Sequence, residues 1–430
     1  MIQEIKVKNF LSFKDEVTFS FEATKDKTFE NDQIITMKDG TRLLRLALLL
    51  GANASGKSNL VSVFNFLNFF WHRKPDLITD KTQVIPFLLD KNTPNQSSQF
   101  EVKFYANDGR YLYRLEIDQE KVISEELLFY SSNRPALLFS RNFNGKISVV
   151  TFNPARIKLK QGAIDEINLK CWKNTSVFSA LSQVNTSIPE IDPVMKWIDN
   201  NCIEDVQDSN LLTYDAKEKM SKDKNAKSYF LNFIKEADIN ISDVNTKEEK
   251  HPIPKNVLNM VISDERIPAV ERERIKQQQT YNDIIADFIY SVKNARGKEV
   301  YSLPERLQSE GTIKVFNVES SIYSALMSES FACIDEIDSS LHPRLLRFLI
   351  LDFLKKKDNK AQLLLTTHYD PILEDIDGIF RKDSVWFTEK KENGSTDLYS
   401  LVEYKGLNRL SSIRNAYKNG VFGAVPDINL

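Results

Sequence analysis

Residues 43–58 read Leu-Leu-Arg-Leu-Ala-Leu-Leu-Leu-Gly-Ala-Asn-Ala-Ser-Gly-Lys-Ser, and this stretch decides the fold. Its first half is an apolar run that ends at Gly51 and is too short to span a membrane. Its second half has the pattern Gly51-x-x-x-x-Gly56-Lys57-Ser58, and a segment with helical spacing follows from Asn59. A buried strand, a glycine-rich turn and a helix N-terminus in this order predict a phosphate-binding loop.

The chemistry of such a loop explains its residue types. Consecutive backbone N–H groups point at the phosphates, and the two glycines allow the backbone to come close. Lys57 supplies a positive charge, and the Ser58 hydroxyl is placed to ligate Mg²⁺. A glycine turn with a surface lysine is the alternative, but here the motif and its context agree. The predicted nucleotide-binding residues are Gly51, Ala52, Asn53, Ala54, Ser55, Gly56, Lys57, Ser58 and Asn59.

The composition is that of a soluble globular protein, with 41% hydrophobic and 27% charged residues. The formal net charge is −2, so nucleic-acid binding would need a local basic patch. The three cysteines, Cys171, Cys202 and Cys333, have no paired spacing, which suits a reducing cytosol and argues against a disulfide scaffold or zinc site. The N-terminus does not resemble a signal peptide, and no apolar window is long enough for a membrane span. We therefore expect a cytoplasmic protein without membrane contact.

Hydrophobic patterning divides the chain into three parts. Residues 1–154 contain alternating segments that predict strands, with hairpin turns at Asn107-Asp108-Gly109 and near Gly145. Residues 155–300 are more polar and compatible with helices, so we expect a mostly helical insert. Residues 301–430 alternate short apolar strands with helices, which predicts an α/β fold with a largely parallel core.

An acidic pair, Asp335-Glu336, follows the apolar segment Ser330–Ile334. Asp335 would hold Mg²⁺ next to Ser58, and Glu336 would orient and polarise the attacking water. A helix N-cap pair after a strand is the alternative, and it would be the better interpretation of the pair alone. The phosphate loop upstream and a third motif downstream favour the nucleotide site.

Two further motifs complete the set. His368 follows the next apolar strand, Gln362–Thr367, and a histidine at that strand end can contact the γ-phosphate through a ring N–H. Ser309-Glu310-Gly311-Thr312 opens a predicted helix, where serine and glycine make an anion site. In a symmetric pair of chains, this site could cap the γ-phosphate that is bound by the other subunit.

These motifs, in this order, resemble ABC-type ATPase heads of the SMC kind. More closely, they resemble the small AAA-family, OLD-like ATPases of bacterial abortive-infection and other anti-phage systems. The resemblance covers about 1–150 and 301–430, and the insert carries no motif that belongs to it. The stretches that carry it are Ile5–Phe13, Gly51–Ser58, Ser309–Thr312, Ile334–Pro343, Thr366–His368 and the tail Gly420–Pro426.

The resemblance implies a fold and a set of roles. The fold would be an ABC-type P-loop ATPase head, with lobe I at 1–154, an antiparallel β subdomain, a helical insert at 155–300 and lobe II at 301–430. Gly51–Ser58 would be the Walker A loop, Asp335 the Walker B aspartate, Glu336 the catalytic glutamate and His368 the switch histidine. Ser309, Glu310 and Gly311 would form the signature motif that acts in trans, and Ser339–His342 the D-loop at the dimer interface. The signature is preceded by Gln308 where an acidic residue is expected, and the Q-loop glutamine stays open between Gln83, Gln96 and Gln99.

The leading functional hypothesis is a switch driven by ATP and Mg²⁺. Two heads, or a higher even number, would dimerise around ATP, separate on hydrolysis, and control a separately encoded effector, such as a nuclease or toxin, in anti-phage defence. The alternative is a DNA repair or maintenance head, but neither a basic groove nor coiled-coil arms are evident, so nucleic-acid binding is possible without support. A GTPase is disfavoured because Asn359-Lys360 is not followed by the base-specifying aspartate. A small-molecule kinase would not be expected to carry the Ser-Glu-Gly motif, and a transporter subunit lacks support from the N-terminal pattern.

Overall fold

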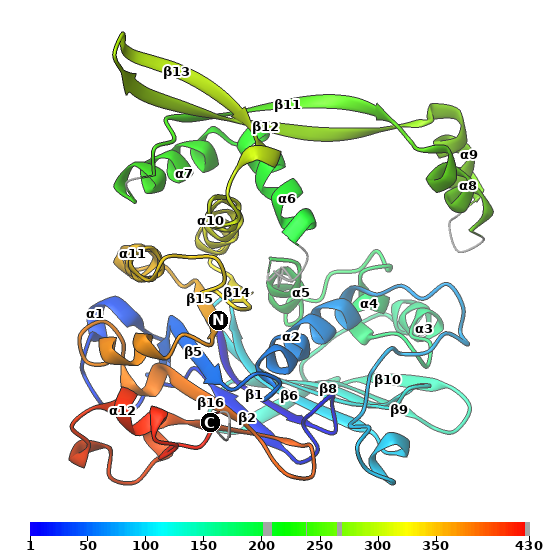
Figure 1. Ribbon diagram of the computed structural model, residues 1–430. Helices are drawn as coiled ribbons and strands as arrows, with labels where there is room; N and C mark the ends of the chain where they lie inside the picture. Colours follow the sequence, from blue (N-terminus) through cyan, green and yellow to red (C-terminus); the bar gives the residue numbers. More distant parts are fainter. Residues whose placement is uncertain (201–208, 238, 265–268, 426–430) are drawn as a thin grey trace. The chain divides into compact units, whose positions relative to one another are not determined.

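The computed structural model describes residues 1–200, 209–237, 239–264 and 269–425 (Figure 1). The chain divides into two compact units, which we describe one at a time. Unit 1 comprises Met1–Gln207, Ser324–Ser339 and Leu346–Leu430, and unit 2 comprises Asp208–Tyr323 and Ser340–Leu345. Each unit is therefore assembled from segments that are distant in sequence.

Unit 1 contains a seven-stranded antiparallel sheet in the order β10-β9-β8-β7-β6-β1-β2. Its strands are β1 (Ile2–Lys8), β2 (Val17–Ser20), β6 (Ser98–Ala106), β7 (Gly109–Ile117), β8 (Val122–Tyr130), β9 (Pro135–Phe143) and β10 (Ser148–Phe152). Asn107 and Asp108 have φ angles of 47° and 62°, as a two-residue hairpin turn between β6 and β7 requires. The predicted antiparallel subdomain and its two hairpins are confirmed.

A second sheet of unit 1 has five strands in the order β14-β15-β5-β16-β17. The first four are parallel, and β17 is antiparallel to β16 at the edge. Every residue of β5, β14 and β15 is buried, because parallel strands are covered on both faces, and this explains their continuous apolar sequences. The predicted parallel core is confirmed. The strands are β5 (Leu46–Gly51), β14 (Phe331–Ile334), β15 (Gln362–Thr367), β16 (Val385–Lys390) and β17 (Thr396–Ser400).

The sequence predicts a single strand for the apolar run from Leu43 to Leu50, but the structure has two. The run is divided at Arg45 into β4 (Arg42–Leu44), which pairs with β3 (Ile34–Thr36), and β5. The buried Arg45 guanidinium donates to the carbonyls of Asp32 and Leu354 at 3.3 and 3.4 Å. Its carbon Cζ lies 4.7 Å from the centre of the Phe353 ring, and burial lowers the pKa of Arg45 to about 10.

Helix α2 (Lys57–His72) follows β5 and packs against both sheets. The ring of Phe64 lies 6.4 Å from that of Phe19 in β2 and 4.7 Å from that of Phe331 in β14, measured between centroids. Its apolar residues on nearly all sides are buried, as the sequence predicts for an enclosed helix. The helix that begins at the phosphate loop is thus held rigidly in the core.

A buried ion pair stabilises the antiparallel sheet. Arg141 of β9 and Glu125 of β8 have completely buried side chains, and their charged atoms lie 3.2 Å apart. Arg141 also donates to the carbonyls of Thr175 and Trp172, and Glu125 accepts from the Ser176 hydroxyl at 2.7 Å. Because both charges have further hydrogen-bond partners, the pair offsets much of its desolvation cost.

Helices of unit 1 include part of the range 155–300. The short helix α4 packs against α2, and the buried Cys171 lies just beyond α3. Cys171 is a free thiol and Cys333 is buried in β14, while Cys202 lies outside the described residues. Two helices, α10 and α11, cross the unit boundaries in sequence. The helices are α1 (Glu30–Gln33), α3 (Gln161–Lys170), α4 (Val177–Leu181), α5 (Asp192–Asn200), α10 (Glu310–Ser328), α11 (Pro343–Lys355) and α12 (Ile413–Lys418).

Unit 2 combines helices with a three-stranded antiparallel sheet in the order β11-β12-β13. The rings of Phe230, Phe288 and Phe316 form its core, with centroids 5.0 and 5.5 Å from that of Phe316. The range 155–300 contains helices together with this sheet, which was not expected from the sequence. The elements are α6 (Ser209–Lys222), α7 (Lys224–Glu236), β11 (Asp243–Pro252), α8 (Lys255–Ser263), α9 (Ala269–Gln278), β12 (Thr280–Asn294) and β13 (Gly297–Pro304).

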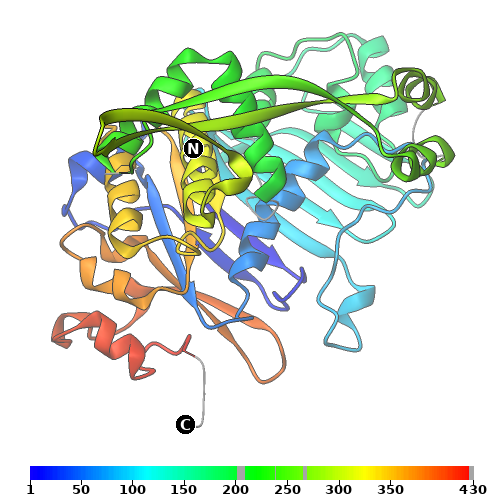
Figure 2. The ribbon, with the colours of Figure 1, turned by 45° about the horizontal axis from the view of Figure 1, so that its top comes forward.

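Strand β12 is the longest element of this sheet and belongs to two hairpins (Figure 2). Its first part pairs with β11 and its last part with β13, and only Asp287, Phe288 and Ile289 pair with both neighbours. Phe288 is completely buried at this junction. Within the described residues, none of the helices combines the length and the apolar character needed to span a bilayer.

Candidate nucleotide site

The predicted phosphate loop lies between β5 and α2 in unit 1. Gly51 is the last residue of β5, and Gly56 caps α2 with a φ of 113°, which a residue with a side chain rarely adopts. Ala54 also has a positive φ of 60°. The backbone therefore turns sharply within 51–56 and places the N-terminus of a buried helix at its end, as a phosphate cradle requires.

The two glycines also allow neighbouring strands to approach. A Cβ atom on Gly51 would lie 2.4 Å from Oγ1 of Thr388 in β16, and one on Gly56 would lie 2.4 Å from Oγ1 of Thr396 in β17. Both threonines brace the loop, because Thr388 hydrogen-bonds the Ser55 hydroxyl at 2.6 Å and Thr396 donates to the Ser55 carbonyl at 2.7 Å. The loop is thus shaped by the sheet edge that faces it.

The N-terminal strand-and-turn segment supports the same loop from another side. The Ser12 hydroxyl accepts from the Asn59 amide at 2.6 Å, and its oxygen lies 2.8 Å from that of the Thr396 hydroxyl, within hydrogen-bond distance. Asn59 was predicted to bind nucleotide, and here it also ties α2 to the segment that carries Ser12. This contact gives a structural reason for the Asn-Phe-Leu-Ser stretch at Asn9–Ser12.

Lys57 is buried and points back over the loop. Its Nζ donates to the carbonyls of Gly51 and Ala52 at 2.9 and 3.0 Å, and lies 3.2 Å from Nδ1 of His368. Burial lowers the pKa of Lys57 to about 8, although the negative charges of the nearby carboxylates, chiefly Asp335, oppose this shift. The protein therefore desolvates the ammonium group in order to place it over the loop, where a bound phosphate would attract it.

The acidic pair lies at the carboxyl end of β14, beside the end of β15. The backbone N–H of Glu336 donates to the Thr366 hydroxyl at 2.8 Å, and that hydroxyl donates to the buried carboxylate of Asp335. Glu336 has a positive φ of 47°, which is uncommon for a residue with a long side chain, and its carboxylate is exposed. Its Oε1 lies 3.7 Å from Nε2 of His368, so the histidine stands between Glu336 and Lys57.

One pocket of about 720 Å³ brings most of these residues together. Its lining includes Asp338 and Lys390, which the sequence analysis did not select. The Asp338 carboxylate accepts a hydrogen bond from the backbone N–H of His368 at 3.3 Å. Lys390 ends β16 and has no ion-pair partner among the described residues. The adjacent Lys391 differs, since it pairs with Asp397 at 2.6 Å. The lining residues are Asn53, Ala54, Gly56, Lys57, Ser58, Asn59, Glu336, Asp338, Ser339, His368 and Lys390.

The donors near this pocket fit a magnesium ion that is completed by a nucleotide. In the described part of the chain, no group of three or more His, Cys, Asp or Glu side chains could hold a metal by itself. Ser58 offers a hydroxyl and Asp335 a carboxylate, which are oxygen ligands of the type that Mg²⁺ prefers. Mg²⁺ commonly takes its remaining ligands from phosphates and water. Two protein ligands are therefore enough for a magnesium ion that is bound together with a nucleotide.

The predicted signature residues lie in unit 2, at the start of α10. The Ser309 hydroxyl caps the helix by accepting from the Thr312 N–H at 3.1 Å. A Cβ atom on Gly311 would lie 2.6 Å from the carbonyl of Ser340, and the Ser340 hydroxyl donates to Glu310 at 3.2 Å. The signature and the adjoining predicted D-loop residues thus contact each other within unit 2.

Several other residues that the sequence singles out do not line this pocket. Gln83, Gln96 and Gln99 are not part of its lining, so the structure leaves the Q-loop residue open. Of the tail Gly420–Pro426, Phe422 packs on Phe387 with ring centroids 5.6 Å apart, and Pro426 lies outside the described residues. The tail therefore supports β16, the strand that carries Lys390.

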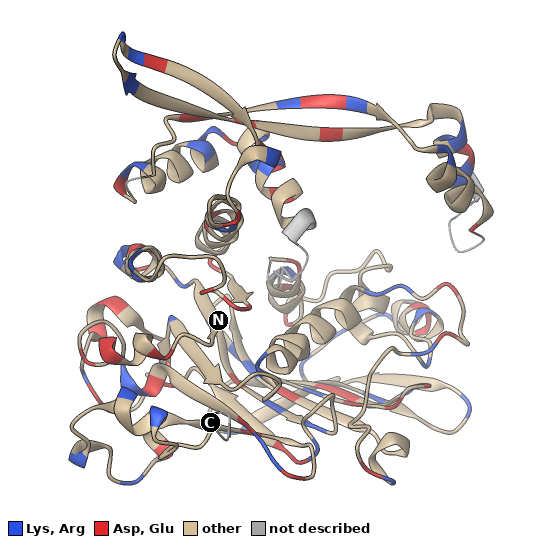
Figure 3. Ribbon diagram, viewed as in Figure 1, with Lys and Arg blue, Asp and Glu red and all other residues tan. Residues whose placement is uncertain are grey.

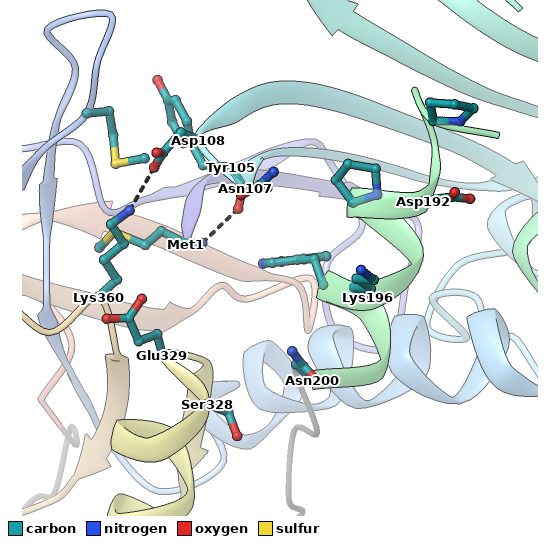
Figure 4. Close-up of a pocket in the computed structure, with 14 residues that line it drawn as sticks. Met1, Tyr105, Asn107, Asp108, Asp192, Lys196, Asn200, Ser328, Glu329 and Lys360 are labelled. Atoms are coloured by element: carbon teal, nitrogen blue, oxygen red, sulfur yellow. Dashed lines mark hydrogen bonds and ion pairs between the residues drawn. The ribbon is translucent and has the colours of Figure 1, made fainter. Parts of the chain in front are cut away.

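A different pocket, of about 510 Å³, lies elsewhere in unit 1 (Figure 4). The side chains of Met1, Lys196, Glu329 and Lys360 are among those that line it, and Lys360 is paired with Asp108 at 2.7 Å. It contains no residue of the phosphate loop or of the acidic pair. Of these two pockets, the 720 Å³ pocket is the one lined by phosphate-loop residues, Glu336 and His368.

Comparison with solved structures gives likenesses to SMC heads. An SMC head bound to the C-winged helix domain of ScpA has 14% sequence identity, a TM-score of 0.41, and coverage of 97% of this chain and 99% of that chain. The SMC head of Thermotoga maritima has 12% identity, a TM-score of 0.40, and coverage of 93% and 98%. A head with an extended coiled coil bound to the C-terminal domain of ScpA, derived from Pyrococcus furiosus, has 13% identity, a TM-score of 0.42, and coverage of 97% and 98%.

The sequence itself matches one protein family over most of its length. None of the curated proteins matches the chain. The family described as "AAA domain, putative AbiEii toxin, Type IV TA system" matches residues 46–161 and 209–374. The match spans the phosphate loop, the signature, the acidic pair and His368. The chain therefore belongs to this family of AAA-domain P-loop ATPases.

Proposed function

We propose that this protein is an ATP-binding and ATP-hydrolysing switch that dimerises around ATP and controls a separately encoded effector. The observation that carries the proposal is the 720 Å³ pocket, in which the phosphate loop faces Glu336 and His368. Segments distant in sequence meet there at the carboxyl ends of parallel strands, where ligands of open α/β sheets bind. Family membership supports ATP as the nucleotide.

Binding would be shared between the loop backbone and Lys57. The N–H groups of 52–58 and the N-terminus of α2 would receive the phosphates, and the Lys57 ammonium would exchange its two carbonyl partners for phosphate oxygens. Ser58 and Asp335 would hold Mg²⁺, which supplies positive charge to the transferring phosphoryl group. The Thr366 hydroxyl would fix the orientation of the Asp335 carboxylate.

Hydrolysis would depend on Glu336. Its exposed carboxylate is free to accept a hydrogen bond from a water molecule and orient it toward the γ-phosphate. His368 lies between Glu336 and Lys57, and Asp338 accepts a hydrogen bond from its backbone. We assign His368 the task of contacting the γ-phosphate and so linking its presence to the position of Glu336.

Dimerisation would complete the site. Ser309, Glu310 and Gly311 open α10, a long helix whose N-terminus can receive an anion. We propose that these residues cap the γ-phosphate on the other subunit, with Ser339–His342 at the interface between the two heads. Nucleotide would then be part of the interface, so that binding and hydrolysis control the association of the subunits.

The effector is proposed from the family. Its description names a putative toxin and a type IV toxin–antitoxin system, which supports a defence role with a toxic partner. The buried, free thiol of Cys171 suits a reducing, cytoplasmic setting. Lys and Arg alternate with Asp and Glu over many elements of both units (Figure 3), which gives no support to a DNA-binding role.

The decisive experiment is gel filtration of Glu336→Gln with ATP and Mg²⁺. The amide keeps the shape of the side chain but cannot act as the carboxylate does, so hydrolysis should fall by at least about a hundredfold and an ATP-dependent dimer should accumulate. Lys57→Ala is the matched control, and it should neither bind ATP nor dimerise. A Glu336→Gln protein that stays monomeric with bound ATP and hydrolyses it at the normal rate would rule out a dimer that forms around ATP.

A further inference from the structure

Helices α8 and α9 form a pair at one end of the ribbon made by β11 and β12 (Figures 1 and 2). Strand β11 ends at Pro252, just before α8, and β12 begins at Thr280, just after α9. The two helices contact each other, and the whole feature lies within unit 2. The ribbon thus presents a helical pair at its end.

Helix α8 leaves its apolar residues exposed or only partly covered. Five of its nine residues are apolar, yet none of the nine is buried. The side chains of Val257 and Met260 are 42% and 70% exposed, whereas Phe230 of α7 in the same unit is completely buried. An amphipathic helix normally places its apolar stripe against a partner, and an exposed apolar patch indicates an interaction site.

Val257 and the partly buried Val261 of this helix line a groove of about 640 Å³, whereas Met260 lies outside its lining. Apolar side chains come from both helices and from the adjoining strand ends. A groove between two antiparallel helices accommodates a third helix that inserts residues at helical spacing. The apolar residues that line it are Ile253, Pro254, Val257, Val261, Ile275 and Tyr281.

The charges at the groove favour an acidic partner. Among the described residues, the charged side chains in the lining are Lys250 and Arg274, and no carboxylate lines the groove. A different protein with carboxylates beside an apolar stripe complements both features of the groove.

We propose that the groove between α8 and α9 docks an acidic amphipathic helix of another protein. Leucine-like side chains of that helix enter among Val257, Val261 and Ile275, and its carboxylates face Lys250 and Arg274. Docking of this kind buries the apolar face of α8 and needs no nucleotide. The inference is therefore independent of the proposed ATP switch.

The test uses the full chain and two fluorescein-labelled helical peptides of about 18 residues with the same leucine stripe. One peptide carries glutamate on its polar face, and the other carries lysine. By fluorescence anisotropy, the glutamate peptide should bind at least about tenfold more tightly than the lysine peptide, and salt should weaken its binding. Val257→Asp should weaken binding of the glutamate peptide by at least about tenfold, and Lys250→Glu should abolish the preference between the two peptides, because its charge would oppose that of Arg274.

Val300→Asp is the matched control, because Val300 is 67% exposed on β13 in the same unit but does not line the groove. It should bind the glutamate peptide as the unaltered protein does. Thermal unfolding should be similar for all three variants, since the altered side chains are exposed. Equal binding of the two peptides, or binding unaffected by Val257→Asp, would overturn the proposal. Concentration-dependent self-association that Val257→Asp abolishes would also overturn it, since the occupant would then be a second copy.

Discussion

The lowered pKa of Lys57 makes nucleotide affinity depend on pH in a specific direction. A phosphate binds the charged ammonium, so nucleotide binding should raise the pKa of Lys57 above its value of about 8 in the free protein. The apparent Kd then grows as the free lysine loses its proton. For a pKa of about 8, the Kd should rise by about tenfold between pH 7 and pH 9, which is about 1.4 kcal/mol.

The assay is a fluorescent ATP-analogue titration at several pH values with constant Mg²⁺ and ionic strength. The informative range lies above about pH 7.5, where the phosphate groups, with a second pKa near 6, are already ionised. Calorimetry in two buffers with different ionisation enthalpies should show uptake of about half a proton per nucleotide at pH 8.

Lys57→Arg is the matched control for this prediction. A guanidinium keeps its charge throughout the range, so the variant should bind more weakly because of its geometry but with a flat pH profile. If the unaltered protein shows a constant Kd from pH 7.5 to 9.5, the burial argument for Lys57 is wrong. A slope that persists in Lys57→Arg would assign the titration to another group.

Three further predictions concern the phosphate loop, Lys390 beside it and the buried ion pair of the antiparallel sheet. Gly56→Ala should abolish ATP binding and lower the melting temperature, because it places a Cβ at φ 113° and 2.4 Å from Thr396, and normal binding would refute the geometry. Lys390→Gln should raise the Kd for ATP about three- to tenfold and reduce its salt dependence, while Lys391→Gln should change neither, and equal effects of the two would remove Lys390 from the site. Arg141→Met should lower the free energy of unfolding by about 3–5 kcal/mol in denaturant titrations, since it leaves a buried carboxylate unpaired, whereas a loss below about 1 kcal/mol would show that the carboxylate is protonated or hydrated.

The sequence predicts those parts of the site that depend on local pattern. The phosphate loop combines glycine spacing with a flanking strand and helix, and Asp335 and His368 each follow an apolar strand. Because carboxyl ends of parallel strands meet at one edge, their convergence follows from the strand assignments. The family resemblance added an order of motifs that the family match supports.

The sequence could not predict features set by the packing of distant segments. Lys390 reaches the pocket because Thr388 pairs with Gly51 across two parallel strands, and a lysine near a strand end gives no signal of that register. Arg45 can be buried within an apolar run because its guanidinium donates hydrogen bonds to carbonyls of segments that are distant in sequence. The sequence does not predict strand β11, because a single one of its ten residues, Val244, is buried. The strand therefore lacks the alternation of apolar and polar residues that indicates a strand.

The double pairing of β12 has a consequence for how this family can diversify. The junction at Asp287–Ile289 fixes both hairpins, but residues beyond it pair with only one neighbour. Adding two residues to each of β11 and β12 would extend the reach of the α8–α9 pair by about 6.8 Å and leave every side chain on its original face. Adding a single residue to each would turn the pair to the opposite face. The length of this ribbon can therefore evolve in steps of two residues, independently of β13 and of the nucleotide site.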